Sequence, residues 1–146
     1  RRTGYTPTSG RRVVQHRRTS GMSIREYFQE IRQLLTTSLF LTAHSITEEE
    51  RPPSAGLIRG ILTFTDGSQL QFKEFVIYKD SIQIKKYSYH YTQSNQLVFR
   101  YDNALDPAAR HLPTYPHHKH LASSIVASDP PRLSDVLQEI SLHIKR

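Results

Sequence analysis

The sequence predicts an α+β domain, built on an antiparallel β-meander of about five strands with an N-terminal and a C-terminal helix. Two observations support this fold class. The middle of the chain is rich in β-branched and aromatic residues and is divided by short polar turns. Apolar residues recur with helical spacing on either side of that region. Residues 22–146 are enough for one domain with a single modest core.

Both predicted helices begin at recognisable signals. Ser23 is a good N-cap, and Glu26 three residues later completes a capping box. Pro130 and Pro131 precede the second helix, and proline is favoured in a first helical turn. The expected apolar stripes are Ile24, Tyr27, Phe28, Ile31, Leu34 and Leu35 in the first helix, and Leu133, Val136, Leu137, Ile140 and Ile144 in the second.

The strands are expected at residues 38–46, 57–65, 69–78, 81–92 and 96–102. Asp66 and Gly67 form the strongest hairpin signal. Residues 103–128 contain three prolines and no clear periodicity, so we expect mainly a long ordered loop, which in a compact domain is usually functional.

Two-residue turns would align the strands in a definite register. One sheet face would then carry Arg59, Glu74, Lys85, Tyr87, Tyr89, Arg100 and Asp102. Glu74 alternates with apolar residues on this face, so its carboxylate needs a partner. It either pairs with Arg59 or Lys85, or acts as a general base or ligand at the edge of the site.

Composition excludes several functional classes. The chain has no cysteine, which rules out a disulfide framework, a cysteine-based zinc site and a thiol nucleophile. No apolar run is long enough to span a membrane. Of the net charge of +7, most lies in residues 1–21, which contain six arginines and no acidic residue. We expect this basic tail to be disordered or non-native, because Met22 is the only methionine; the alternative is a nucleic-acid-binding arm.

The most concentrated chemistry lies in residues 116–120, where His117, His118 and His120 flank Lys119. Imidazoles can act as acid and base on a phosphodiester without a metal. Arg100 or Lys119 would stabilise the phosphate charge, and Asp102 would orient a histidine. The weaker alternative is a metal site completed by Asp102 or Glu74. The histidine segment could also be a solvated loop.

The remaining candidates would contact the substrate. Tyr87 and Tyr89 could stack on the bases of single-stranded RNA, although tyrosine is also ordinary strand filling. Lys85 could contact a phosphate. Asn103 follows a strand end, where it could either serve the site or form an Asx-turn.

A succession of four motifs resembles the TumE family of prokaryotic type II toxins. The motifs are Phe72-Lys73-Glu74-Phe75, Tyr87-Ser88-Tyr89-His90-Tyr91, Phe99-Arg100-Tyr101-Asp102-Asn103-Ala104 and Tyr115-Pro116-His117-His118-Lys119-His120. The resemblance covers about residues 22–145, and it implies a native start near Met22 and a small cognate antitoxin as partner. It also implies important roles for Glu74, Tyr89, Arg100, Asp102, Asn103, His117, His118 and His120.

The sequence therefore predicts a cytoplasmic toxin that acts as a metal-independent endoribonuclease with no cofactor. It would form a homodimer or a toxin–antitoxin hetero-oligomer and would not engage a membrane. One alternative is a non-catalytic growth inhibitor that binds a cellular target such as the ribosome. Another is a metal-dependent nuclease or nucleotidyltransferase.

Overall fold

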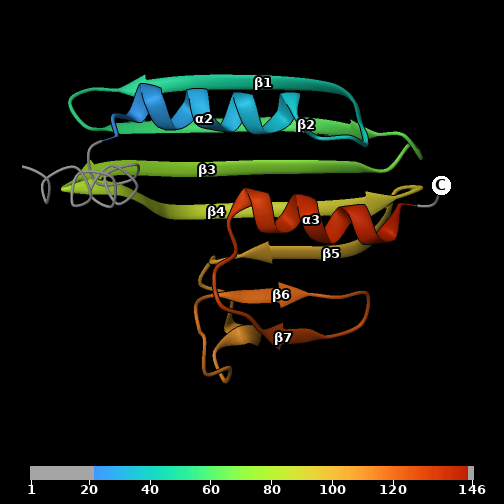
Figure 1. The fold of residues 1–146 in the computed structure, drawn as a ribbon. Helices are drawn as coiled ribbons and strands as arrows, with labels where there is room; N and C mark the ends of the chain where they lie inside the picture. The colour runs from blue at the N-terminus through green and yellow to red at the C-terminus, as the bar shows by residue number, and fades with distance from the viewer. Residues whose placement is uncertain (1–21, 145–146) are drawn as a thin grey trace, which may run out of the picture.

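The computed structural model describes residues 22–144, and the predicted basic tail lies outside this range. Within it, seven strands form one antiparallel sheet in the order of the sequence, and helices α2 and α3 lie against the same face (Figure 1). The strands are β1 (Leu41–Arg51), β2 (Ala55–Phe64), β3 (Gln69–Lys79), β4 (Ser81–Gln93), β5 (Gln96–Asp102), β6 (His118–His120) and β7 (Ile125–Ala127). The predicted α+β class and terminal helices are confirmed.

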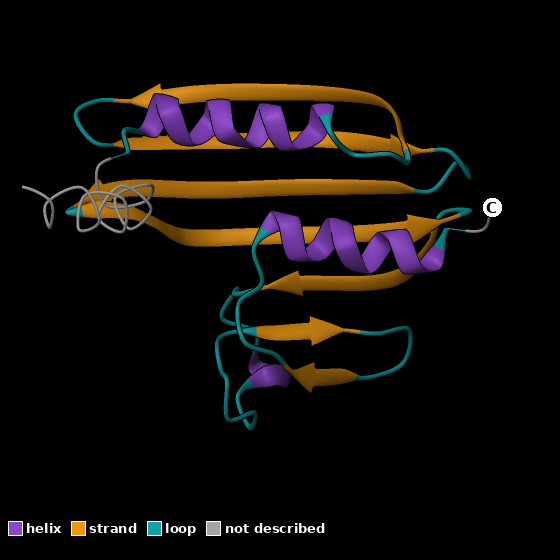
Figure 2. Cartoon of the chain, viewed as in Figure 1, coloured by secondary structure: helices purple, strands orange, loops and turns teal. Residues whose placement is uncertain are grey.

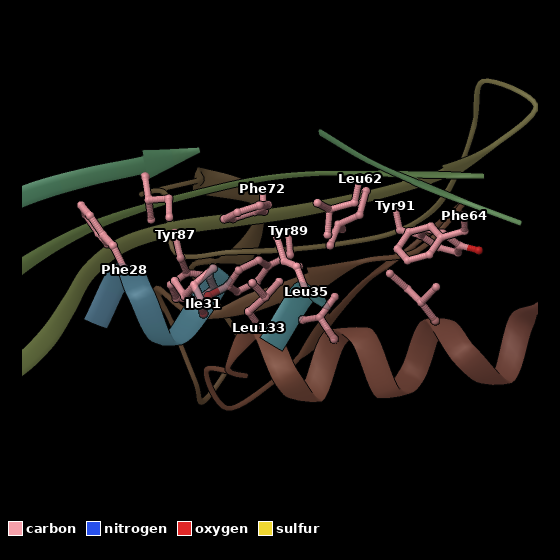
Figure 3. Packing of buried hydrophobic residues seen from close by; sticks show 14 of the residues in the cluster. Phe28, Ile31, Leu35, Leu62, Phe64, Phe72, Tyr87, Tyr89, Tyr91 and Leu133 are labelled. Carbon is pink, nitrogen blue, oxygen red and sulfur yellow. The ribbon is translucent and has the colours of Figure 1, made fainter. Parts of the chain in front are cut away.

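The helices begin close to where their signals stand. Helix α2 (Ile24–Thr36) has the predicted capping box, in which Ser23 and Glu26 bond each other's backbone N–H groups. Helix α3 (Leu133–His143) follows the proline pair. Their apolar stripes pack on a tyrosine- and phenylalanine-rich sheet face, here called the helix face (Figure 3). Neither helix is long and apolar enough to cross a bilayer.

The sheet has seven strands rather than the predicted five, because residues 103–128, although mainly loop as predicted, also form two short strands. These residues contain a 3₁₀ turn, η1 (Pro107–Ala109), and the short strands β6 and β7 (Figure 2). A strand of three residues is too short to display a period of two, which explains why the pattern was missed. Strand β1 also extends to Arg51, five residues beyond the predicted end at residue 46.

The predicted register is wrong in three hairpins. Between β3 and β4, Glu74 pairs with Tyr87 instead of Lys85, because the turn at Asp80 is one residue shorter than predicted and a bulge follows at Phe75. Thr63 pairs with Gln69, so the loop around Gly67, whose φ is 84°, is one residue longer than predicted. Arg59 therefore pairs with Lys73 instead of Glu74. A bulge between Tyr91 and Thr92 then shifts the pairing of β4 with β5. Since each one-residue shift turns side chains to the other face, these irregularities separate the predicted set.

The consequence is a sheet with two different faces. Glu74, Tyr87 and Tyr89 are buried on the helix face. Arg59, Arg100 and Asp102 lie on the opposite face, which neither α2 nor α3 covers, and which we call the uncovered face. Paired residues of antiparallel strands point to the same side. One row of paired residues on the uncovered face therefore runs Thr47, Arg59, Lys73, Ser88, Asp102 and His118 from β1 to β6.

Candidate functional site

Three side chains converge where β5 meets β6, and we call them the Asp102 cluster: Asp102, His118 and His120. His118 Nε2 lies 3.1 Å from Asp102 Oδ1 and 3.1 Å from His120 Nε2. His120 Nε2 lies 3.7 Å from Asp102 Oδ2. Asp102 and His118 are buried, whereas the His120 side chain is 25% exposed. A buried set of ionisable groups thus has one member open to solvent.

Strand pairing explains why the cluster forms. Asp102 pairs with His118, and Arg100 pairs with His120, so alternate residues of two neighbouring strands reach the same face. His118 Nδ1 lies 2.7 Å from the Pro116 carbonyl oxygen. A carbonyl only accepts, so Nδ1 carries the proton and the lone pair of neutral His118 is at Nε2. That lone pair faces the other two members of the cluster.

Arg100 joins the cluster to the rest of the uncovered face. Its Nε donates to Asp102 Oδ2 over 2.8 Å, and its side chain is 40% exposed. Asp102 Oδ1 also accepts from the Ala104 backbone N–H. These contacts fix the carboxylate while leaving much of the guanidinium accessible. Arg100, which pairs with His120, therefore lies beside the histidine segment.

Two adjoining grooves cross the uncovered face, and both are lined by Lys73, Ser88 and Arg100. The larger has a volume of about 750 Å³ and reaches Asp102 and Asn103. The cations lining the two grooves are Arg51, Arg59, Lys73, Lys86 and Arg100, and Asp102 is the one carboxylate among the lining residues. His118 and His120 lie beside the grooves, on the far side of β5. The surface leading to the cluster is strongly basic.

A family model described as Toxin TumE matches residues 24–146. The chain belongs to the TumE family of toxins. This membership makes it a toxin of a toxin–antitoxin system and implies a cognate antitoxin as its partner. No curated protein and no solved structure shows detectable similarity to the chain.

Two predicted site residues of this TumE-family chain lie in the core instead. Glu74 is fully buried on the helix face and accepts hydrogen bonds from Tyr27 and Tyr89, over 2.5 and 2.6 Å. Burial raises the pKa of Glu74, although both hydroxyls oppose this by stabilising the carboxylate. The structure therefore does not bring Glu74 or Tyr89 to the Asp102 cluster, and neither predicted ion pair of Glu74 forms.

Lys119 also points to the helix face, because it lies between two histidines that point the other way. Its Nζ donates to Glu139 Oε2 over 2.8 Å and lies 4.8 Å from the centre of the Tyr101 ring. The Tyr101 hydroxyl donates to the other oxygen of Glu139. Lys119 thus ties β6 to α3, on the opposite side of the sheet from Arg100.

His117 and Tyr87 form a separate pair next to the cluster. Their rings are stacked with centroids 5.8 Å apart, and the Tyr87 hydroxyl lies 2.9 Å from His117 Nδ1. Burial, and then the Asp102 charge, raise the pKa of Tyr87. With so little of the Tyr87 ring exposed, stacking on a base would require rearrangement.

Asn103 bridges two backbone groups of β4. Its side-chain oxygen accepts from the Tyr87 N–H over 3.1 Å, and its amide donates to the Lys85 carbonyl over 3.0 Å. Lys85 itself is exposed at a bulge in β4. Asn103 therefore continues the ladder past the end of β5, which gives it a structural role beside its predicted contact with substrate.

Sequence reasoning missed Asp106 and the groove cations Arg51, Arg59, Lys73 and Lys86 as site residues. Asp106 caps η1 through Oδ1, and its Oδ2 lies 3.8 Å from His120 Nε2. The Asp-Pro pattern at residues 106–107 indicates such a capped turn and could have located it. The groove cations could only be assigned to a face once the loop around Gly67 had fixed the register.

Proposed function

We propose that the chain is an endoribonuclease toxin, which binds RNA across the uncovered face and cleaves it at the Asp102 cluster. The observation that carries the proposal is the continuity of the basic grooves with that cluster through Arg100. A polyanion is the ligand that such a surface attracts. RNA cleavage also explains how a chain of this size can be toxic.

The grooves offer a path for the RNA backbone. Arg59, Lys73 and Asp102 belong to one row of paired residues. Neighbouring strands lie about 4.8 Å apart, so Lys73, on the second strand from Asp102, stands about 10 Å from it. Lysine and arginine on successive strands can therefore hold successive phosphates while one phosphodiester lies at Arg100. The shallow, open surface suits single-stranded RNA.

Arg100 and the members of the Asp102 cluster take different parts in the chemistry. Arg100 offsets the negative charge that develops on the phosphate. His120 is the exposed imidazole of the cluster, so it is the member that reaches the substrate. Asp102 and His118 are positioning residues because both are buried behind it.

The predicted mechanism, in which two imidazoles act as acid and base on one phosphodiester, fits this arrangement poorly. His118 and His120 bring their Nε2 atoms within 3.1 Å of each other, which leaves no room for a phosphate between them. The alternative of a metal-dependent nuclease fits the spacing better.

The test is an assay of the purified full chain with a labelled single-stranded RNA, in which binding and cleavage are measured separately. We expect cleavage at defined positions, with binding that weakens steeply as salt is added. Binding without cleavage, together with growth arrest that survives His120→Ala, would contradict the proposal. That outcome would favour the non-catalytic inhibitor.

A further inference from the structure

The Asp102 cluster has an arrangement that requires a cation. His118 carries its proton on Nδ1, which donates a hydrogen bond to the Pro116 carbonyl oxygen. The Nε2 lone pair of neutral His118 then faces Asp102 Oδ1 and His120 Nε2, each 3.1 Å away. A lone pair and an ionised carboxylate repel each other unless a proton or a metal ion lies between them.

A single proton satisfies this arrangement less completely than a metal ion. An N–H on His118 can point directly at only one of its two neighbours, and the other atom stays in close contact without a bond. Both neighbours are donor atoms for metals, as is His118 Nε2 itself. The three ligand atoms lie within 4.8 Å of one another.

We propose that Asp102, His118 and His120 bind one divalent transition-metal ion. The spacing supports this assignment. Zinc–ligand distances of about 2.1 Å place the ligand atoms of a tetrahedral site about 3.4 Å apart. His118 Nε2 lies 3.1 Å from Asp102 Oδ1 and from His120 Nε2, and the other carboxylate oxygen, Oδ2, lies 3.7 Å from His120 Nε2. Two imidazoles and one carboxylate suit zinc, iron or manganese, and leave further positions open.

The surroundings of the cluster are those of a metal site. The Pro116 carbonyl holds the outer nitrogen of one histidine, as a second partner does for most metal-bound histidines. The carboxylate is fixed by Arg100 Nε and the Ala104 N–H. Asp106 presents Oδ2 3.8 Å from His120 Nε2, where it could hold a water molecule on the ion. Buried ligands and one exposed ligand place the open positions toward the solvent.

The catalytic consequence of this site rests on the proposed ribonuclease function, whereas metal binding itself does not. A bound ion would act as a Lewis acid on a phosphate held by Arg100. This replaces the metal-independent mechanism predicted from the sequence. The assignment of roles changes accordingly, because His120 becomes a ligand that faces the substrate.

The test is titration of the chelator-treated full chain with Zn²⁺ and Co²⁺, followed by calorimetry and by visible absorption of the Co²⁺ form. We expect one ion per chain and at least about 100-fold weaker binding in His120→Ala, since that variant loses an exposed ligand and keeps the buried pair. The matched control is His111→Ala, an exposed histidine outside the cluster, which should bind like the wild type. Long-range ¹H–¹⁵N spectra should report metal at Nε2 of His118 and His120.

The possible results separate the two proposals. No stoichiometric binding, or equal affinity in His120→Ala and His111→Ala, overturns the metal site. RNA cleavage that persists undiminished in the metal-free chain overturns the catalytic role of the ion, and leaves the ribonuclease proposal standing. One tightly bound ion in a chain that does not cleave RNA supports the metal site and overturns the ribonuclease function.

Discussion

Tyr89 donates its hydroxyl hydrogen to Glu74 Oε2 over 2.6 Å, inside the layer between the sheet and the helices. Tyr27 of α2 donates to the other oxygen of the same carboxylate. Glu74 therefore connects a helix to two strands through bonds that are sealed from water. This arrangement makes Glu74 a determinant of stability and leaves RNA chemistry to the opposite face.

Glu74→Gln should change how stability depends on pH. Burial raises the pKa of Glu74 above that of the same carboxyl in the unfolded chain. Its contribution to stability is then fully present below the unfolded pKa, and is lost as the pH rises through the folded pKa. Denaturant unfolding from about pH 4 upward should show the wild type losing stability relative to Glu74→Gln, by at most about 1.4 kcal/mol per pH unit. Parallel curves for the two proteins would show that the carboxyl titrates alike in both states.

Lys119→Ala should weaken the fold without weakening RNA binding. The substitution removes a bond to Glu139 and the contact of the ammonium with the Tyr101 ring. We expect a loss of about 1–2 kcal/mol of unfolding free energy, measured in urea. Lys119→Met, which keeps the aliphatic packing, is the control for lost volume. A large drop in RNA affinity at unchanged stability would instead favour the phosphate contact predicted from the sequence.

Lys73→Ala should weaken RNA binding without weakening the fold. Lys73 lines both grooves and is exposed on the uncovered face. The free energy of unfolding should change by less than about 0.5 kcal/mol. The salt dependence of RNA binding should decrease by about 0.7 in log–log slope, which corresponds to one lost phosphate contact on a single strand.

The control for Lys73→Ala is Arg32→Ala, since Arg32 pairs with Glu48 on the helix side of the sheet. It removes the same charge from the chain without changing the grooves. Equal losses of RNA affinity in the two variants would mean that net charge, rather than the uncovered face, drives binding.

Asn103→Asp tests the bridge between β5 and β4. The aspartate keeps an acceptor for the Tyr87 N–H and loses the donor to the Lys85 carbonyl. We expect a loss of about 1–2 kcal/mol in thermal or urea unfolding, and a larger loss in Asn103→Ala, which removes both bonds. Wild-type stability in both variants, with impaired cleavage, would indicate that Asn103 serves the substrate instead.

The sequence predicted the helices, the turn positions and the central strands because these features are local. Ser23 and Glu26 cap a helix through bonds three residues apart, and the turn at Ser94 and Asn95 has the positive φ angles that such residues tolerate. Residues 118–120 were singled out by composition alone. Their strand character was missed because β6 is defined by pairing with β5 rather than by its own pattern.

The orientation of side chains could not be predicted, because it depends on single-residue irregularities. The extra loop residue near Gly67 decides that Arg59 faces away from Glu74, and the bulge at Tyr91 decides that Arg100 and Asp102 face away from Tyr89. Such a bulge leaves no local signature in composition. The resulting error placed Glu74 with Arg59, whereas one of the two observed partners of Glu74, Tyr27, comes from α2 across the core.

The most direct test of the account compares RNA cleavage by the wild type and His120→Ala under single-turnover conditions, with thermal stability measured on the same samples. The account predicts at least about a 100-fold slower cleavage in His120→Ala at an unchanged melting temperature. His111→Ala should cleave like the wild type. Cleavage by His120→Ala at the wild-type rate would contradict the assignment of the Asp102 cluster as the reaction centre.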